Sequence, residues 1–182
     1  MRIDELDGTI IFPNGLSISP SITQQEFIET PGFASAESKE YGTLPYIHYR
    51  FSGGCHDGKE LSASVCFYDQ MFLSINISAN LYPPGDWDWS NYSLEVESKA
   101  KHFHDQLLEQ ILGKPTKGGS FLFHQIPEID ETLKKPLEWR FPWGNVYSGH
   151  DWRGGGTSFG LNFGTRHEKA HWAYKRMKGE LE

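Results

Sequence analysis

Apolar and polar residues alternate most regularly between residues 61 and 79. The apolar members of the first run are Leu61, Ala63, Val65 and Phe67, and those of the second are Met71, Leu73, Ile75, Ile77 and Ala79. Ser62, Ser64, Cys66 and Tyr68 alternate with the first set, and Ser74, Asn76 and Ser78 alternate with the second from Leu73 onward. One apolar and one polar face per strand is typical of an antiparallel sheet. Asp69-Gln70 forms the tight connection between the two strands.

Shorter patterns predict the remaining strands. Residues 9–12 and 16–19 flank Pro13-Asn14-Gly15 and predict a hairpin. A strand over Tyr46–Phe51 is followed by a turn from Gly53 to Gly58, whereas residues 33–44 have the composition of a loop. Further short strands are expected at Phe121–Phe123, Leu137–Phe141, Val146–Gly149 and Thr157–Phe163, with Gly154-Gly155-Gly156 as a turn.

The spacing of apolar residues predicts one long helix, from Ser93 to Leu112. Its apolar positions are Leu94, Val96, Ala100, Phe103, Leu107 and Ile111. Glu95 with Lys99, and Glu97 with Lys101, are four residues apart and are expected on its wetter sides. Thr23 and Glu26 match a capping box that begins a short helix ending at Pro31-Gly32, and a terminal helix is expected over Thr165–Met177.

These elements predict one α+β domain spanning residues 1–182. We expect an antiparallel sheet of about six or seven strands, covered on one face by the long amphipathic helix. The chain is 14% aromatic and 37% hydrophobic, which is too rich in core formers for a disordered chain. It contains no apolar run long enough to span a bilayer and no secretory leader pattern, so we expect a cytoplasmic protein that does not act at a membrane.

Charge is distributed unevenly along the chain. Residues 1–113 hold 16 acidic and 6 basic side chains, whereas residues 114–182 hold 8 acidic and 11 basic ones, for a net charge of -7 overall. An acidic surface repels phosphate, so binding to nucleic acid is disfavoured. A basic protein partner is favoured instead.

Histidine followed by aspartate occurs three times, at His56-Asp57, His104-Asp105 and His150-Asp151. Such pairs ligate metal in some phosphohydrolases, but those enzymes place their ligands on several long helices. On the long helix His102 and His104 are two residues apart and point to different sides, unlike the four-residue spacing that chelates one ion. We therefore expect no metal and no other cofactor.

Candidates for nucleophilic catalysis are weaker still. Cys66 is at a strand position, where a small buried thiol is common. Gly154-Gly155-Gly156 lacks the Lys-Thr/Ser ending of a phosphate-binding loop, and no Gly-x-Ser-x-Gly elbow is present. The sequence thus assigns no catalytic residue.

Two tryptophan-rich segments offer an alternative to catalysis. Trp87 and Trp89 alternate with Asp86 and Asp88 just before the long helix. Either one indole is core and the aspartates complement the helix dipole, or the segment is an exposed acidic and aromatic anchor of the kind that concentrates binding energy. A second group raises the same alternatives: Trp139, Trp143, Tyr147, His150, Asp151, Trp152 and Arg153.

Several motifs follow one another in a characteristic order over most of the chain. They are Asn14-Gly15-Leu16, Ser19-Pro20, Phe27, Asp86–Ser90, Lys101, His104-Asp105, Leu112–Pro115, Trp143-Gly144, Val146, Ser148, Asp151 and Arg153. This order resembles that of small bacterial immunity proteins encoded beside secreted polymorphic toxins. The resemblance implies a non-enzymatic, cytoplasmic protein that binds a toxin domain and blocks it, and it transfers no functional residue.

The leading hypothesis is therefore an immunity protein that neutralises a basic toxin, such as a nuclease, through acidic and aromatic side chains. The expected partner-binding residues are Asp86, Trp87, Asp88, Trp89, Glu95, Glu97, Asp105 and Glu109. Two alternatives stay open: a metal-assisted hydrolase that uses the His-Asp pairs, and an adaptor module in a larger assembly.

Overall fold

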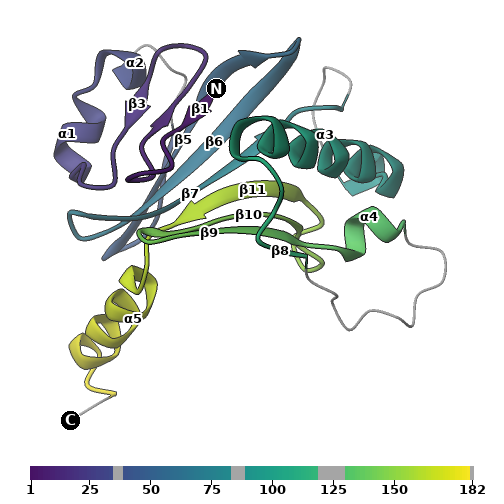
Figure 1. Ribbon diagram of the computed structural model, residues 1–182. Coiled ribbons are helices and arrows are strands. Elements are labelled where there is room, and N and C mark those ends of the chain that lie inside the picture. The colour runs from purple at the N-terminus through teal and green to yellow at the C-terminus, as the bar shows by residue number, and fades with distance from the viewer. Residues whose placement is uncertain (35–38, 83–88, 119–129, 181–182) are drawn as a thin grey trace.

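An antiparallel sheet of eight strands dominates the described part of the chain (Figure 1). The computed structural model describes residues 1–34, 39–82, 89–118 and 130–180. The strand order is β4-β5-β6-β7-β11-β10-β9-β8. Its first half consists of β4 (Lys39–Thr43), β5 (Tyr46–His56), β6 (Lys59–Tyr68) and β7 (Met71–Ala79). Its second half consists of β8 (Lys117–Gly118), β9 (Leu137–Phe141), β10 (Gly144–His150) and β11 (Thr157–Asn162).

The two halves are antiparallel meanders that meet where β7 pairs with β11, with Ile77 opposite Phe159. Helix α3 (Leu94–Leu112) connects them, because it follows β7 and leads to β8 at the far edge of the sheet. It lies across the sheet, in contact with β7, β10 and β11. The 3-10 helix η1 (Trp89–Asn91) precedes α3, and the short helix α4 (Glu131–Lys134) packs beside it.

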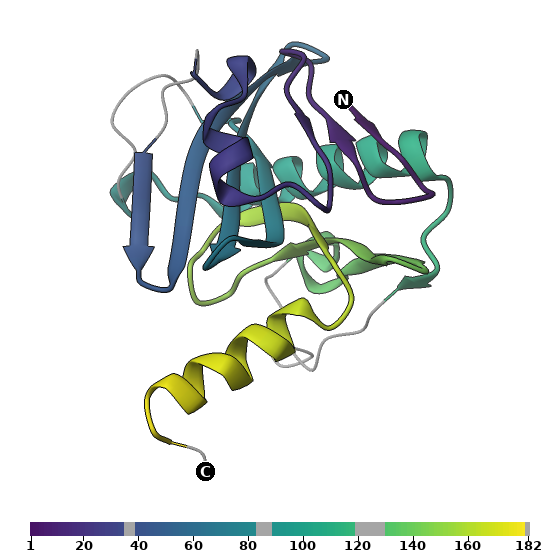
Figure 2. The same cartoon turned by 90° about the vertical axis from the view of Figure 1, so that its left-hand side faces the viewer.

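The N-terminal segment covers the other half of the same face (Figures 1 and 2). It contains a small three-stranded sheet of β1 (Arg2–Ile3), β2 (Ile10–Ile11) and β3 (Ser17–Ile18), followed by α1 (Gln24–Ile28) and α2 (Pro31–Ala34). Phe27 of α1 is fully buried, and its ring is 5.7 Å from that of Phe51 and 5.6 Å from that of Phe67. Aromatic contacts of this kind fix these short helices on the sheet.

Apolar and polar side chains alternate along the strands, and this explains why one face of the sheet is covered and the other is open. Leu61, Val65 and Ile75 are fully buried in the main core, together with Phe159 and Leu161. The residues between them on the opposite face are mostly polar and less buried, including Ser62, Ser64, Asn76, Ser78, Ser158 and Asn162. Only at the end near the β6–β7 turn does α5 (Arg166–Met177) pack against this open face, where Ala170 contacts the cluster of Cys66 and Leu73.

The expected fold class, α+β with an antiparallel sheet packed against one long helix, is confirmed. Ser93 caps α3, since its hydroxyl accepts a hydrogen bond from the backbone N–H of Val96. The capping box of Thr23 and Glu26 is present, and the terminal helix forms over nearly the expected residues.

Several boundaries differ from expectation. Residues 33–44 are not all loop, because α2 ends at Ala34 and β4 pairs along the edge of β5. Strand β5 continues through Gly53 and Gly54 by means of a register shift and turns only at Asp57-Gly58. The N-terminal hairpin gains β1 as a third strand, and the expected strand at Phe121–Phe123 lies outside the described residues.

The buried side of α3 overlaps only in part with the one that its apolar spacing indicates, since Ala100 and Leu107 are buried but Val96, Phe103 and Ile111 only partly so. The expectation that Glu97 and Lys101 lie on a wetter side is wrong, because Glu97 is 5% and Lys101 0% exposed, whereas Leu94 is 40% exposed. The buried residues are Glu97, Ala100, Lys101, His104, Leu107 and Leu108, which recur at the three- and four-residue spacing of one helix face. Three polar side chains therefore belong to the interface with the sheet.

The Lys101 ammonium is neutralised within α3 itself. Its Nζ atom donates to both carboxylate oxygens of Asp105, each 2.6 Å away. Burial lowers the pKa of Lys101, and the attraction of the Asp105 carboxylate opposes this effect. Asp105, 17% exposed at its side chain, is thus the counter-ion of a buried cation.

Asp105→Asn should therefore destabilise the fold markedly. It leaves the buried Lys101 ammonium without a counter-charge, which costs on the order of 3 kcal/mol when a buried ion pair loses one partner. Urea unfolding of the two proteins measures the difference. Glu95→Gln is the matched control, because it breaks the exposed pair between Glu95 and Lys99 on the same helix and should leave the transition midpoint unchanged. Equal effects of the two substitutions would contradict the assigned role of Asp105.

Candidate functional site

Four of the eight expected binding residues belong to the segment before α3. Asp86, Trp87 and Asp88 lie outside the described residues, and Trp89 is described only in its backbone, as the first residue of η1. Their role therefore stays a prediction.

Glu95 and Glu109 form the exposed acidic part of α3. They are 14 positions apart in the sequence, which places them about 21 Å apart along the helix axis and within about 40° around it. The Glu95 carboxylate accepts a hydrogen bond of 2.6 Å from Lys99, and this bond lowers the pKa of Glu95. Both glutamates lie on the outer side of the helix, where the Lys99 ammonium accompanies the charge of Glu95.

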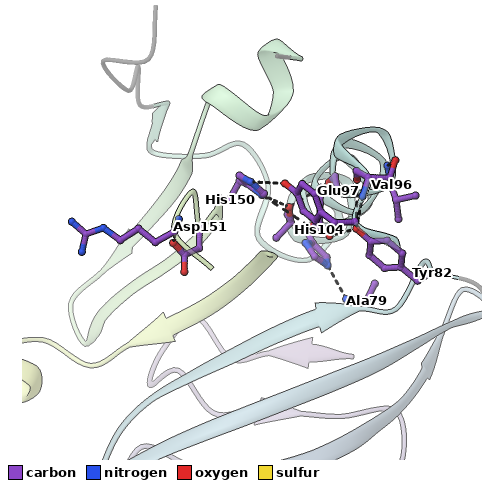
Figure 3. Close-up of polar contacts among 11 residues, drawn as sticks. Ala79, Tyr82, Val96, Glu97, His104, His150 and Asp151 are labelled. Atoms are coloured by element: carbon purple, nitrogen blue, oxygen red, sulfur yellow. Dashed lines mark hydrogen bonds and ion pairs between the residues drawn. The ribbon is translucent and has the colours of Figure 1, made fainter. Parts of the chain in front are cut away.

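Glu97 points instead into the space between α3 and the sheet (Figure 3). Its carboxylate accepts a hydrogen bond of 2.7 Å from the hydroxyl of Tyr82. Burial, together with this bond to a carboxylate, raises the pKa of Tyr82 to about 12. The tyrosine therefore remains a neutral donor, and Glu97 fixes the chain after β7 against the first turn of α3.

His150 of β10 extends this buried network. Its Nδ1 atom is 3.0 Å from the Thr157 hydroxyl, and the same hydroxyl donates to the backbone oxygen of Glu97 at 3.4 Å. Nδ1 is then the protonated nitrogen, which leaves Nε2 to accept from the hydroxyl of Tyr92 at 3.5 Å. Burial lowers the pKa of His150, although the Glu97 carboxylate 4.0 Å away acts in the opposite direction. The network joins β10, β11 and the start of α3.

His104 is the third buried polar residue of α3, and one of its ring nitrogens has no partner. Nε2 accepts a hydrogen bond of 2.9 Å from the backbone N–H of Ala79, so the proton is on Nδ1 (Figure 3). Among the described residues, His104 Nδ1 and Ser148 Oγ are the buried side-chain atoms that lack a hydrogen-bond partner. Burial, and secondarily the charge of Lys101, lowers the pKa of His104 to about 3.

The three His-Asp pairs do not assemble into one site. Asp105 binds Lys101, while the Asp151 carboxylate accepts from the backbone N–H of Arg153 in the turn before β11. His56 is the last residue of β5, and Asp57 follows it in the β5–β6 turn. Within the described ranges, no three His, Cys, Asp or Glu side chains are grouped closely enough to hold a metal ion.

Cys66 is a poor nucleophile in this position. Its thiol is buried next to α5, and burial raises its pKa to about 11. A thiol with so high a pKa is almost entirely protonated near neutral pH, and the thiolate is the reactive form. His48 Nε2, 3.7 Å from the sulfur, has its own pKa lowered by burial and supplies no positive charge.

The aromatic residues of the second group divide between core and surface. Trp139 is 1% exposed and donates its indole N–H to the backbone oxygen of Gly113 at 2.9 Å. Trp143 is partly exposed, stacks on Phe141 and donates to the backbone oxygen of Glu5. Tyr147 lies on the open face. Asp151 and Arg153 are exposed turn residues, and Trp152 packs edge-on against His150.

A groove of about 530 Å³ lies beside the buried network, where the first turns of α3 approach the open face of the sheet. Residues from both parts line it, among them Ser64, Ser78, Ser158, Tyr82, Glu97 and Gly155. Sequence reasoning missed this groove and the partners of Glu97, because each wall comes from a different part of the chain. The serines were visible in the strand alternation, but their common position beside Glu97 was not.

None of the helices in the described part of the chain is long and apolar enough to cross a membrane.

Comparison with known proteins gives one informative result. No protein-family model matches the sequence, and no curated protein is significantly similar to it. A chain in the solved structure of Rhs1-CT in complex with cognate immunity protein RhsI1 has the same fold, with a TM-score of 0.53 and 10% sequence identity. The match covers 100% of this chain and 99% of that one. The resemblance to immunity proteins noted in the sequence is thus confirmed as a likeness of fold.

The position of His104 generates a prediction about pH. Its pKa in the folded state, about 3, is below the ordinary value of 6.5, so the unfolded chain binds a proton that the folded chain does not. This contribution to stability is present above pH 6.5 and is lost as the pH falls towards 3, by up to about 1.4 kcal/mol per pH unit. His104→Gln, whose amide oxygen can still accept from Ala79, should flatten the fall by this amount.

Urea unfolding at intervals between pH 7 and pH 4 measures the slopes. His102→Gln is the control, since His102 is an exposed histidine on the same helix and its variant should keep the slope of the natural chain. If both variants flatten the curve equally, the burial of neutral His104 is not the cause.

Proposed function

We propose that this chain is an immunity protein, which binds a toxin domain and blocks it without performing catalysis. The observation that carries the proposal is the fold shared over the whole chain with a component of a toxin–immunity complex. Shared fold alone does not establish function, so the surface chemistry of this chain must agree with it. The following features support that agreement.

The charged surface suits a basic partner. The chain has a net charge of -7, and its first 113 residues hold 16 acidic side chains against 6 basic ones. Exposed Glu95 and Glu109 place two of these charges on the outer side of α3. A nuclease domain is a suitable target, because a surface that binds phosphate is basic and would be attracted to such a helix.

The candidate catalytic groups have other tasks in the fold. Asp105 neutralises a buried lysine, Asp151 stabilises a turn, and the Cys66 thiol is kept protonated by burial. A metal-assisted hydrolase would need these groups to converge. Their separation among the described residues favours a binding protein over that alternative.

The binding surface that we propose combines the outer side of α3 with the segment before it. Glu95 and Glu109 supply the described part, and Asp86, Trp87, Asp88 and Trp89 are proposed to supply the acidic and aromatic remainder. Glu97 and Asp105 belong to the same helix but have partners within the fold, since Glu97 binds Tyr82 and Asp105 binds Lys101. Acidic side chains would speed capture, and aromatic anchors would slow release. Action in the cytoplasm agrees with two unpaired cysteines, Cys55 and Cys66.

A growth assay tests the function directly. The C-terminal domain of the toxin gene adjacent to this chain's gene is expressed in a bacterial host, with and without this chain. We expect growth arrest by the toxin domain alone and restored growth with this chain, together with a complex of equal stoichiometry after purification. Growth arrest that persists despite abundant folded chain would overturn the proposal.

Charge reversal on α3 tests the surface. Glu95→Lys combined with Glu109→Lys should reduce the association rate with the toxin domain several-fold at low salt and less at high salt, since exposed charges act over a distance that salt shortens. Stopped-flow measurements at several salt concentrations give these rates. Two reversals elsewhere, Glu5→Lys with Glu168→Lys at exposed positions outside α3, are the matched control and should have a smaller effect. Equal effects of both pairs would remove α3 from the interface.

A further inference from the structure

A second groove, of about 620 Å³, lies at the opposite end of β7 from the α3 connection. It is formed between the β4–β5 turn, the β6–β7 turn and the end of α5, which projects from the body of the protein at this place (Figure 2). The binding surface proposed above does not include any of its residues. It is a separate feature of the fold.

Two of the large apolar side chains that line this groove are mostly exposed to solvent. Leu44 is 75% exposed and Met177 is 60% exposed, and both line it. Pro45 and the buried residue Ile47 continue the apolar lining from the adjacent turn and strand. Large apolar side chains that gather around one exposed depression mark interaction sites more often than the same residues scattered singly.

The charged residues that line the groove are both acidic. Glu40 and Asp69 are exposed, and no lysine or arginine of the described chain lines it. On α5, Lys175, Arg176 and Lys178 flank Met177 but do not line the groove, and Lys175 and Lys178 lie over the rings of Trp172 and Tyr174, at 5.5 Å and 5.2 Å. An apolar centre with an acidic rim fits an apolar side chain that is flanked by lysine or arginine.

Helix α5 is held to the body mainly through its first half. Arg166 donates to the backbone oxygens of Pro20 and Phe72, at 2.6 Å and 2.8 Å, and Ala170 is the buried residue of the helix. Beyond the contact between the rings of Tyr174 and Tyr46, the last turn contributes Met177 to the groove. A helix of 12 residues is marginally stable in water on its own. A partner seated against Met177 would therefore stabilise its last turn.

We propose that this groove binds an apolar side chain on a basic segment of the toxin domain, as a second anchor of the complex. The inference rests on the function proposed above. Charge complementarity favours this occupant, because the charged residues that line the groove, Glu40 and Asp69, are acidic and the proposed toxin is basic. A second copy of this chain, which has a net charge of -7, is the alternative occupant that the crosslinking experiment below tests.

Substitution of the two exposed apolar residues tests the anchor. Leu44→Ser combined with Met177→Gln should weaken binding of the same toxin domain at least tenfold in isothermal titration calorimetry, mainly through faster dissociation. Both side chains are largely exposed, so the fold should be retained, as circular dichroism and the urea midpoint can verify. The matched control is Leu6→Ser, which removes a leucine that is 89% exposed and does not line the groove. This variant should bind as the natural chain does.

The acidic rim is tested by Glu40→Gln with Asp69→Asn. Glutamine can still accept the hydrogen bond that the Tyr49 hydroxyl gives Glu40, and asparagine tolerates the positive φ of 53° at position 69. We expect a several-fold lower association rate and a weaker dependence on salt. Unchanged kinetics would overturn the choice of a basic occupant.

A crosslinking experiment identifies what occupies the groove. A photoreactive phenylalanine derivative is placed at position 44, or at position 6 as a control, in the full chain mixed with the toxin domain. Crosslinks from position 44 to the toxin domain support the proposal, whereas crosslinks to another copy of this chain overturn it in favour of self-association.

The outcomes separate this inference from the function on which it rests. If the natural chain restores growth and binds the toxin domain, but the Leu44 and Met177 variant binds equally well, only the second anchor is wrong. If the natural chain does not bind the toxin domain at all, the proposed function fails, and the anchor fails with it.

Discussion

Each central strand of the sheet has one apolar and one polar face, and this alternation decides where the other elements pack. In β6 and β7 nearly every second side chain is apolar and buried, so all elements that can cover apolar surface must lie on that side. The small N-terminal sheet, α1, α2 and α3 share this face. The face that carries the serines and asparagines is left open. Helix α5 packs on it where the apolar side chains of Cys66 and Leu73 interrupt the polar surface. Both grooves follow from this arrangement.

Helix α3 meets the same constraint with an unusual set of side chains. It presents a carboxylate, an ammonium and an imidazole to the sheet, yet nearly all of their polar atoms have a partner: Glu97 has Tyr82, Lys101 has Asp105, and His104 has the backbone N–H of Ala79. Buried polar groups are costly when unpaired and geometrically demanding when paired. The orientation of the helix on the sheet is therefore specified by directed bonds as well as by packing. The outer side of α3 is left to Glu95 and Glu109.

Local patterns predicted much of this fold, and the failures have a physical reason. The alternation over residues 61–67 and 75–79 and the capping box at Thr23 depend on neighbours in the sequence, so they could be recognised without a structure. The expected place of Leu73 on the apolar face is wrong, because the pairing of β6 with β7 shifts register there and Leu73 joins Cys66 on the open face. Strand β4 could not, because its residues are strands only by pairing with the edge of β5. The exposure of Leu94 and the burial of Glu97 were also not predicted. Glu97 is buried in contact with Tyr82, a residue outside the helix, so the spacing within α3 does not reveal it. The exposed acids of α3 could thus be named in advance, whereas the grooves, assembled from distant segments, could not.

The positions of the two proposed contact surfaces determine how they can work together. Helix α3 follows the end of β7 at Ala79, and the groove at Leu44 and Met177 lies near the start of that strand. Strand β7 has nine residues, which corresponds to a separation of about 30 Å between its ends. Charges are screened beyond about 8 Å at physiological ionic strength, so the α3 glutamates cannot attract a segment that is docking in the groove. A partner that uses both surfaces must therefore contact each of them directly. Such an interface would combine rapid capture at the acidic helix with slow release at the apolar groove, because exposed charges act mainly on association and buried apolar contacts mainly on dissociation.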